Sequence, residues 1–372
     1  MTPDMPADSA ATATAWAERL FVALPLAALA VLGLALWQPG QALVLGLSGL
    51  ALIAAVSAAV HHAEVVAHRV GEPFGTLVLA LAVTIIEVAL IVSVMLSADP
   101  AKAATLTRDT IYATVLIITG GVLGLSLLMG GLRHHVQSFH TEAARPALAI
   151  LVALSVLVLV LPRFTSSAPG GQYSVPQLMF IAAASLALWG VFIFGQTVRH
   201  RDYFLDSDAT DAHADSAHQP TRRDAWLSLG LLLLALVAVV GLAKTLSPSI
   251  EAAVVGAGLP HAVIGLIIAM LVLAAETVAA VRAALGNRLQ TSLNLALGSA
   301  LASIGLTIPV VVGVSILLGL PLDLGLGDKD LVLLVLSLLV SSITLGSRRT
   351  DFTLGAVHLV VFAAFLFLTL VP

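Results

Sequence analysis

The sequence predicts an all-α polytopic membrane protein with about 11 transmembrane helices. Hydrophobic residues make up 59% of the chain and charged residues only 10%, whereas a soluble domain carries about 25% charged residues. Apolar runs recur between charged or Gly- and Pro-containing breaks, and about 20 apolar residues can cross a bilayer core of ~30 Å. The runs lie near 20–37, 42–60, 74–96, 110–132, 147–161, 177–198, 226–243, 260–281, 291–318, 331–345 and 352–371.

The composition excludes several classes of protein. Cysteine is absent, which rules out disulfides, thiolate catalysis and sulfur-ligated metals. No basic patch or nucleic-acid motif is present, so no nucleic acid is expected as a partner. The expected partners are the lipid bilayer, inorganic cations and protons, and no cofactor is expected. The segment 1–19 carries Asp4, Asp8 and Glu18 against Arg19. It lacks the basic region of a signal peptide, and the first helix is expected to be retained. The oligomeric state is left open.

Lys and Arg are distributed unevenly between alternate connecting segments. With the N-terminus in the cytoplasm, 12 of them fall inside and five outside. Because cytoplasmic loops carry an excess of Lys and Arg, the sequence predicts an inner-membrane protein with a cytoplasmic N-terminus. The inside residues are Arg19, Arg69, Arg133, Arg145, Arg199, Arg201, Arg222, Arg223, Arg282, Arg288, Arg348 and Arg349. The outside residues are Lys102, Arg108, Arg163, Lys244 and Lys329.

Two acidic residues interrupt the apolar runs. Glu87 lies close to the middle of the run 74–96, and Glu276 lies in the run 260–281. A carboxylate at membrane depth costs roughly 2.5–3.5 kcal/mol, and such residues mark ion and proton pathways. The sequence therefore predicts a functional role for both acids.

The two acids lie in halves of the chain that resemble each other. Setting the first helix aside, five runs lie on each side of a polar linker, and a Gly-x-Pro precedes each acid at a similar distance, at 71–73 and at 258–260. An odd number of helices requires the two halves to be inserted upside down relative to each other. Inverted repeats with a site near the midplane are typical of secondary transporters. The predicted organisation is an N-terminal tail and extra helix (1–41), a first five-helix repeat (42–198), a cytoplasmic linker (199–225) and a second repeat (226–372).

Paired carboxylates suit a site that binds a cation and protons in turn. Hard cations prefer carboxylate, carbonyl and hydroxyl oxygen, and nearby carboxylates repel each other, which favours proton uptake when the cation leaves. The run after each acid contains small residues, at 119–121 and at 298–299, which can let a helix unwind or pack closely. The possible additional ligands are Thr84, Thr119, Gly120, Asn294, Gly298, Ser299 and Ser303.

Three stretches resemble the bacterial branch of the calcium/proton exchanger (CAX) family, within the cation/calcium exchanger superfamily. They read GEPFGTLVLA (71–80), TIIEV (84–88) and LNLALGSALASIGLTIP (293–309), and the resemblance covers about residues 42–371. It implies one extra helix followed by two inverted five-helix repeats, with an acid in the second helix of each repeat binding the ion. Those roles would fall to Glu87 and Glu276. The implied function is secondary active export of Ca²⁺ in exchange for H⁺ by alternating access.

The chain departs from that family immediately before each acid. Better-known members place Gly-Asn three to four residues ahead of the acid, where this chain has Val83-Thr84 and Val272-Leu273. Fewer amide oxygens are then available to a cation. An Na⁺(K⁺)/H⁺ antiporter of the same fold is therefore the alternative.

Histidines cluster in two segments that the apolar runs place in cytoplasmic loops. His61, His62 and Glu64 lie in one, and His134 and His135 in the other. Histidine titrates near neutral pH, so these five residues are possible regulatory groups, although solvated loop residues are the favoured interpretation. The linker carries Asp206, Asp208, Asp211 and Asp215. These acids lack the spacing of an EF-hand loop, so a disordered linker is favoured there.

A rhomboid-like intramembrane serine protease is a further alternative. Residues 46–49, Gly-Leu-Ser-Gly, are similar to the rhomboid nucleophile motif, and His358 could act as a base. Short Gly/Ser matches are common in membrane helices because small residues serve packing. The protease leaves Glu87 and Glu276 unexplained, so no enzymatic activity is expected. An ion channel with the same acids also stays open, and coupling of ion flux to proton flux separates it from an antiporter.

Overall fold

The chain divides into two compact units. The computed structural model describes residues 7–71, 74–97, 103–204 and 220–371. Unit 1 comprises residues 1–82 and 218–249, and unit 2 comprises residues 83–217 and 250–372. Each unit takes helices from both predicted halves of the chain, so the compact units do not follow the chain order.

Unit 1 contains α1 (Ala7–Trp37), α2 (Ala42–Val70), the start of α3 (Phe74–Ser97) and most of α9 (Arg222–Gly256). Gly241 of α9 packs directly against the Leu32 side chain of α1, at a position where a Cβ would clash. At the end of α2, Gly71 takes a φ of 77°, which favours glycine. The N–H of Gly75 then donates to the carbonyl of Gly71 at 2.8 Å. Gly71 therefore ends α2, and its carbonyl is bonded to the first turn of α3.

Helix α2 continues to Val70, well beyond the predicted end of its apolar run at 60. Residues 60–70 contain neither Gly nor Pro, and valine and alanine recur among the polar residues, so nothing stops the helix before Gly71. The prediction of a loop at His61, His62 and Glu64 was therefore wrong. His62 is buried, with its ring close to the Phe21 carbonyl of α1 (3.1 Å) and to Ser228 Oγ of α9 (3.3 Å).

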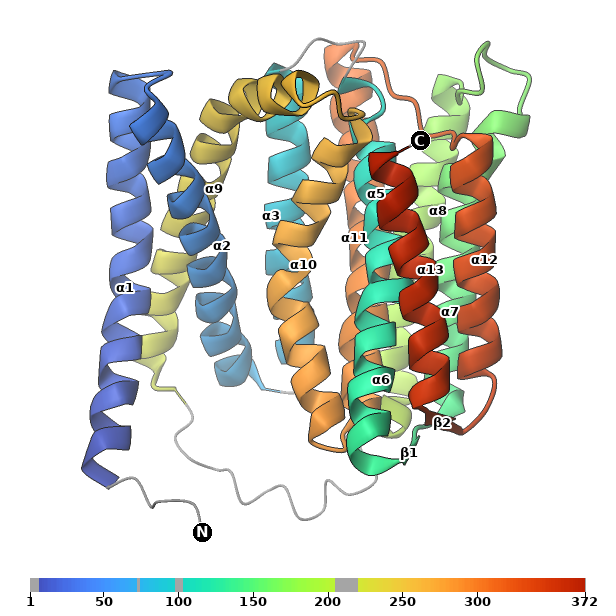
Figure 1. The fold of residues 1–372 in the computed structure, drawn as a ribbon, viewed down its shortest axis with the longest axis horizontal. Coiled ribbons are helices and arrows are strands. Elements are labelled where there is room, and N and C mark those ends of the chain that lie inside the picture. The colour runs from blue at the N-terminus through green and yellow to red at the C-terminus, as the bar shows by residue number, and fades with distance from the viewer. Residues whose placement is uncertain (1–6, 72–73, 98–102, 205–219, 372) are drawn as a thin grey trace. The chain divides into compact units, whose positions relative to one another are not determined.

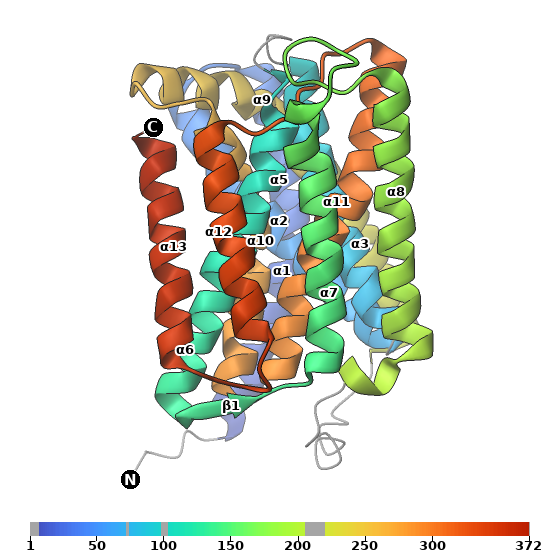
Figure 2. The same cartoon turned by 90° about the vertical axis from the view of Figure 1, so that its right-hand side faces the viewer.

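Unit 2 contains the rest of α3, the end of α9 and the remaining helices, gathered around α11. This helix contacts α5, α6, α7, α8 and α10, and Figures 1 and 2 show it among them. The helices are α5 (Leu106–Leu116), α6 (Leu123–His134), α7 (Thr141–Ser155), α8 (Val175–Phe194), α10 (Ala262–Leu285), α11 (Leu289–Leu318), α12 (Asp328–Leu345) and α13 (Phe352–Leu370). Three short π-helical turns extend them, η1 (Ile117–Val122), η2 (Val156–Val160) and η4 (Gly195–Arg199). Two 3₁₀ turns do so as well, η3 (Leu161–Phe164) and η5 (Arg201–Phe204).

The prediction of an all-α polytopic membrane protein is confirmed. Ten helical segments of the described residues are long and apolar enough to cross a membrane. The difference from the 11 predicted spans is α12, which begins with three charged residues, Asp328, Lys329 and Asp330. Helix α9 is longer than its predicted run of 226–243, because the polar residues after 243 do not break it.

The two ends of unit 2 differ in charge. At one end, β1 (Val136–Ser138) and β2 (Arg349–Asp351) form an antiparallel ribbon. Gln137 donates from this ribbon to Ala284 O at 2.9 Å, so the end of α10 lies there too. Eight basic residues belong to this end among the described residues of unit 2: Arg133, Arg145, Arg199, Arg201, Arg282, Arg288, Arg348 and Arg349. The opposite end carries Arg108, Arg163 and Lys329.

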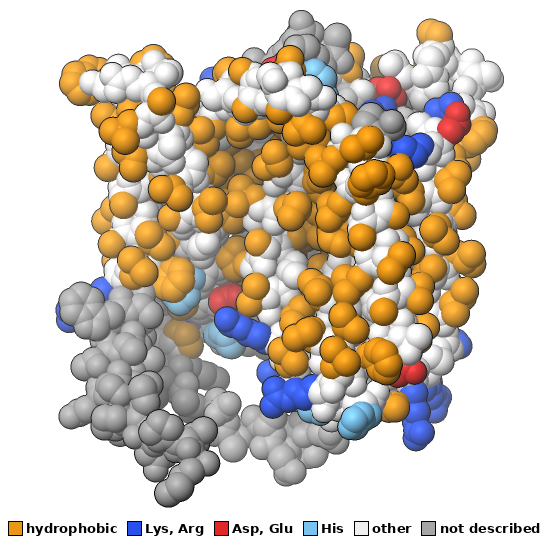
Figure 3. Space-filling model, in the orientation of Figure 1, with side chains coloured by type: hydrophobic (Ala, Val, Ile, Leu, Met, Phe, Trp, Pro, Cys, Tyr) orange, Lys and Arg blue, Asp and Glu red, His pale blue; other side chains and the backbone are white. Residues whose placement is uncertain are grey.

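The surface pattern agrees with helices that face lipid. Figure 3 shows apolar side chains covering the helical walls, whereas Lys and Arg side chains lie toward the ends. Large apolar side chains such as Leu317 (83% exposed) and Val360 (69% exposed) lie fully on the surface. Exposed apolar patches of this extent are typical of surfaces that contact a membrane or another protein, and not of a surface that faces water.

Candidate functional site

Glu87 lies inside unit 2 with only 1% of its surface exposed. Because α3 runs from Phe74 to Ser97, the acid sits near the middle of a membrane-spanning helix. Its Oε2 accepts a hydrogen bond from the Ser303 hydroxyl of α11. The hydroxyl of Thr114 on α5 also interacts with the carboxyl group. Oε1 has no hydrogen bond of ordinary geometry in the described part of the chain, so it retains capacity for a further ligand.

Glu276 occupies the matching place on α10. This helix runs from Ala262 to Leu285, so Glu276 also lies near the middle of its helix. Its Oε2 accepts a hydrogen bond from the Ser299 hydroxyl of α11. It is partly exposed, in contrast to Glu87. The two carboxyl groups are close enough to interact electrostatically. The fold therefore brings together two acids from opposite halves of the chain.

One helix supplies a hydroxyl to the acid of each half. Ser299 and Ser303 are four residues apart on α11 and so lie on the same side of the helix, one turn apart. Both are buried. The helix stays regular through Gly298 and ends at Gly319, which takes the left-handed conformation with a φ of 64°. The regular α-helical geometry sets the spacing of the two hydroxyls.

The other predicted ligands divide into residues beside the acids and residues bonded elsewhere. Thr84 is buried three residues before Glu87, on the same side of α3. Apart from its chain neighbours and the backbone of its own helix, no described atom lies within 4 Å of the place where Gly298 would carry a Cβ, so open space adjoins Gly298. Asn294 is occupied differently: its amide donates to Phe204 O at 2.6 Å, and its Oδ1 accepts from Gln290 at 2.8 Å.

The segment 119–121 packs against α12 and α13. The Thr119 hydroxyl donates to Val115 O at 2.6 Å and lies 2.7 Å from the Ser337 hydroxyl of α12. A Cβ on Gly120 would come within 3.0 Å of Phe362 Cβ. The π-helical turn η1 contains both residues. The helix is thus widened here, as the glycines suggested, but the observed contacts are packing contacts with α12 and α13.

Two threonines of α5 were missed in the sequence, although a signal for them exists. The step along the chain from Glu87 to Thr110 equals the step from Glu276 to Ser299. In the same way, the step from Glu87 to Thr114 equals the step from Glu276 to Ser303. The small residues at 119–121 and at 298–299 follow Glu87 and Glu276 at unequal intervals, so matching them to each other does not lead to these threonines. Both threonines are buried, and the Thr110 hydroxyl has no hydrogen-bond partner in the described part of the chain.

The five possible regulatory residues lie outside this group of side chains. His61, which stacks on Phe21 with a centroid distance of 4.0 Å, belongs to unit 1, as do His62 and the exposed Glu64. His134 is the last residue of α6, and its Nε2 lies 2.9 Å from Leu285 O at the end of α10. His135 follows it in a left-handed conformation before β1.

The chemistry available beside the acids is therefore carboxylate and hydroxyl oxygen. Among the described residues no three His, Asp or Glu side chains come together as a metal site. Oxygen ligands suit hard cations and protons. Two carboxylates that repel each other can exchange a bound cation for protons at little cost, since a cation and protons each neutralise the pair.

The chain matches one family model and two bacterial ion transporters over nearly its whole length. The sequence model of the family described as sodium/calcium exchanger protein matches residues 40–198 and 227–371. The y4hA protein of Sinorhizobium fredii is 49% identical over 345 residues, which cover 92% of this chain and 93% of that protein. The sodium-potassium/proton antiporter ChaA of Escherichia coli is 38% identical over 350 residues, or 91% and 93% of the two chains.

A solved structure shares the fold. The crystal structure of the selenium-substituted Ca²⁺/H⁺ antiporter protein YfkE superimposes with a TM-score of 0.72. The match covers 95% of this chain and 99% of that one at 18% sequence identity. At this identity the likeness establishes the fold alone.

Proposed function

Because the chain belongs to the sodium/calcium exchanger protein family, we propose that it is a secondary active antiporter that exports a cation, Ca²⁺ in the first place, in exchange for protons. Glu87 and Glu276 bind the cation and the protons in turn. The chain acts as a transporter and not as an enzyme, and it uses no cofactor.

One observation carries this proposal. Two carboxyl groups, each in the middle of a membrane-spanning helix, interact with each other and each accept a hydrogen bond from the same helix. Placing two carboxylates at this depth is costly unless they bind a partner. Since Oε1 of Glu87 has no protein partner of ordinary geometry among the described residues, it has capacity for one.

Exchange follows from competition for the same oxygens. A cation between the two carboxylates neutralises their repulsion, and protons do the same when the cation leaves. The protein can then carry either the cation or the protons across the membrane, but the pair of acids is not stable with neither bound. Alternating access of the site to the two faces converts a proton gradient into cation export.

The predicted orientation has support in unit 2. Its β1–β2 end carries eight basic residues and the opposite end three, among the described residues. The positive-inside rule places the β1–β2 end in the cytoplasm, which corresponds to a cytoplasmic N-terminus in the inner membrane of a bacterium. The family match in two segments, 40–198 and 227–371, supports two repeats separated by the linker 199–225.

A specific observation favours Na⁺ or K⁺ as the second candidate cation. Ca²⁺ takes six to eight oxygen ligands and commonly uses amide oxygen. Here the Asn294 amide is bonded to Phe204 and Gln290, which leaves carboxylate and hydroxyl groups beside the acids. The similarity to the sodium-potassium/proton antiporter ChaA points the same way.

The protease alternative gains no support from the position of His358. Its Nε2 lies 3.0 Å from the Thr344 hydroxyl of α12, within a buried polar contact that holds α13 to α12. An imidazole engaged in this way is already occupied and serves packing.

The deciding experiment uses the purified chain in sealed vesicles with a pH-sensitive dye inside. The vesicles are challenged in turn with Ca²⁺, Na⁺ and K⁺, each at equal ionic strength. A cation-driven pH change that is lost in Glu87→Gln identifies the antiporter and its substrate together. Cation flux without proton flux would identify a channel and contradict the proposal.

A further inference from the structure

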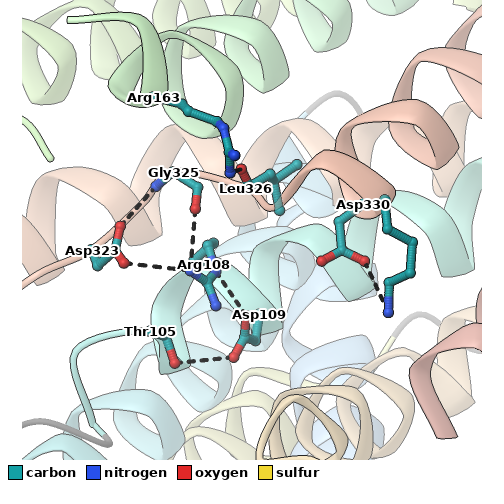
Figure 4. Close-up of polar contacts among 9 residues, drawn as sticks. Thr105, Arg108, Asp109, Arg163, Asp323, Gly325, Leu326 and Asp330 are labelled. Atoms are coloured by element: carbon teal, nitrogen blue, oxygen red, sulfur yellow. Dashed lines mark hydrogen bonds and ion pairs between the residues drawn. The ribbon is translucent and has the colours of Figure 1, made fainter. Parts of the chain in front are cut away.

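Arg108, in the first turn of α5, reaches across to the segment that follows α11. Figure 4 shows its contacts: Nη1 donates to Gly325 O at 3.1 Å and lies 3.5 Å from Asp323 Oδ2. Its Nε donates to Asp109 Oδ1 at 2.9 Å. Thr105 donates to the other oxygen of Asp109 at 3.2 Å. The guanidinium group therefore binds α5 to residues 323–325, in addition to the backbone hydrogen bond that Asp323 N–H donates to Ala104 O, just before α5, at 2.9 Å.

The segment that Arg108 binds is firmly joined to α11. After the helix ends at Gly319, Leu320 N–H donates to Ser315 O at 2.9 Å, and the Ser315 hydroxyl donates back to Leu320 O at 2.7 Å. Alternate leucines of the segment then point into unit 2 and are buried. They are Leu322, Leu324 and Leu326. The segment is therefore joined to α11 at its start, and further along Asp323 N–H donates to Ala104 O and Leu326 N–H to Leu159 O, each at 2.9 Å.

Arg108 thus connects the two helices that carry hydroxyl groups to the acids. On α5, Thr110 and Thr114 both follow Arg108 within two turns of the helix. On α11, Ser299 and Ser303 precede the segment held by Arg108. The Thr114 hydroxyl of α5 and the Ser303 hydroxyl of α11 both interact with the Glu87 carboxyl group, so the separation of the two helices determines how far apart these hydroxyls lie.

We propose that Arg108 is a positioning residue for cation exchange, which fixes the separation of α5 and α11 and thereby the size of cation that the acids accept. Discrimination between cations depends on cavity size and on the number and rigidity of the oxygen ligands. The inference rests on the proposed function, because it concerns selectivity at the same pair of acids.

The planar fork of arginine explains why this residue type occupies the position. Arginine can donate in several directions at once from a rigid group, and here it contacts two carboxylates and a carbonyl. Lysine keeps the charge but concentrates it at one point. The Arg108 side chain is only 21% exposed, so its contacts are shielded from water and salt.

The chain offers a matched control in Arg163. This residue binds the same segment from a different helix: Nη1 donates to Leu326 O at 3.0 Å, and Nη2 lies 3.0 Å from Asp328 Oδ1. Figure 4 shows Arg163 approaching from the other side of the segment. Arg163 lies in η3, which carries none of the hydroxyls near the acids. Its loss removes contacts of the segment with η3 and leaves the Arg108 contacts in place.

The experiment compares Arg108→Met, Arg108→Lys and Arg163→Met in the dye-loaded vesicles. Apparent KM and maximal rate are measured for Ca²⁺, Na⁺ and K⁺. In Arg108→Met we expect the KM for the best cation to rise about tenfold, as for loss of a charged hydrogen bond. The ratio of KM values between cations should change as well. Arg108→Lys should restore part of the ratio, and Arg163→Met should change KM by no more than about twofold.

Equal effects of Arg108→Met and Arg163→Met would overturn the proposal, because they would reveal only a general role of the segment. An unchanged ratio of KM values in Arg108→Met would overturn it too. If that variant does not fold, Asp323→Asn decides, since it retains the Arg108 contacts to Asp109 and Gly325 and should shift the ratio in the same direction. The wild-type protein separates the two proposals. If it shows no cation/proton exchange, the proposed function is contradicted. If it exchanges and the Arg108 variants behave like it, only the positioning role of Arg108 is contradicted.

Discussion

Ser303 donates a hydrogen bond to Glu87, although the two residues are 216 positions apart and lie in opposite halves of the chain. Ser299, one turn away on the same helix, bonds the acid of its own half, Glu276. Helix α11 therefore connects the two acids. A movement of α11 changes the surroundings of both carboxyl groups at once, which is what a shared site requires.

The first prediction concerns the acids. Glu87→Gln and Glu276→Gln keep the shape of the side chain but remove the charge and the exchangeable proton. Each should abolish cation-driven proton movement while the chain still inserts, since a neutral amide costs less in the membrane than a carboxylate. Glu87→Asp should be milder, because the charge remains.

The double variant tests whether the two acids act as a unit. Glu87→Gln with Glu276→Gln should be no worse than either single change, since residues of one site are non-additive. Proton movement is followed with the internal dye, and folding by thermal unfolding in detergent. Undiminished exchange in either single Gln variant would leave that glutamate as a structural carboxylate.

The second prediction concerns the two serines of α11. Ser303→Ala and Ser299→Ala should each raise the apparent KM for the cation about five- to tenfold, as expected for loss of a hydrogen bond worth about 1–1.5 kcal/mol. Ser341→Ala is the matched control, because its buried hydroxyl donates to the Ser337 carbonyl of α12, at 2.8 Å, and to neither acid. A control that lost as much affinity would show that the effect is not specific to the acids.

The third prediction concerns Thr114. Thr114→Val preserves shape and removes the hydroxyl that interacts with Glu87. We expect a higher KM for the cation with little loss of thermal stability. Thr369→Val, which removes a buried hydroxyl of α13 bonded to Phe365 O at 2.8 Å, should leave transport unchanged. Equal transport by both variants would remove Thr114 from the site.

The fourth prediction separates His62 from the other histidines. His62→Ala should lower the free energy of unfolding by about 1–3 kcal/mol, since it leaves the buried Ser228 hydroxyl and Phe21 carbonyl without this partner. A triple Gln variant at His61, His134 and His135 should keep most of the maximal transport rate. Stability is measured by thermal unfolding and transport with the dye. Loss of transport in the triple variant, at the level of Glu87→Gln, would assign these histidines a direct role.

The fifth prediction concerns the linker 199–225, of which residues 205–219 lie outside the described residues. A protease added to sealed right-side-out vesicles should not cleave it, because the positive-inside rule places it in the cytoplasm. In inside-out vesicles the protease should cleave the linker and leave the membrane core of the protein intact. Cleavage from the outside would invert the orientation of the whole chain.

The sequence by itself determined the class of protein and the place of the acids. The apolar runs predicted the membrane-spanning helices because hydrophobic length is a local property. Glu87 and Glu276 stood out because a carboxylate in an apolar run is costly wherever the helix is placed. The equal intervals that separate each acid from the hydroxyl residues of the next helix would also have indicated Thr110 and Thr114.

Only the tertiary structure decided which groups meet. Ser303 crosses to the acid of the other half, the Asn294 amide is bonded to Phe204, His62 is buried between three helices, and Arg108 binds the segment after α11. Each of these contacts depends on how helices distant in the chain pack. Local pattern fixes the face on which a side chain lies, but the partner on that face is set by helix packing, and this has no signature within a single run.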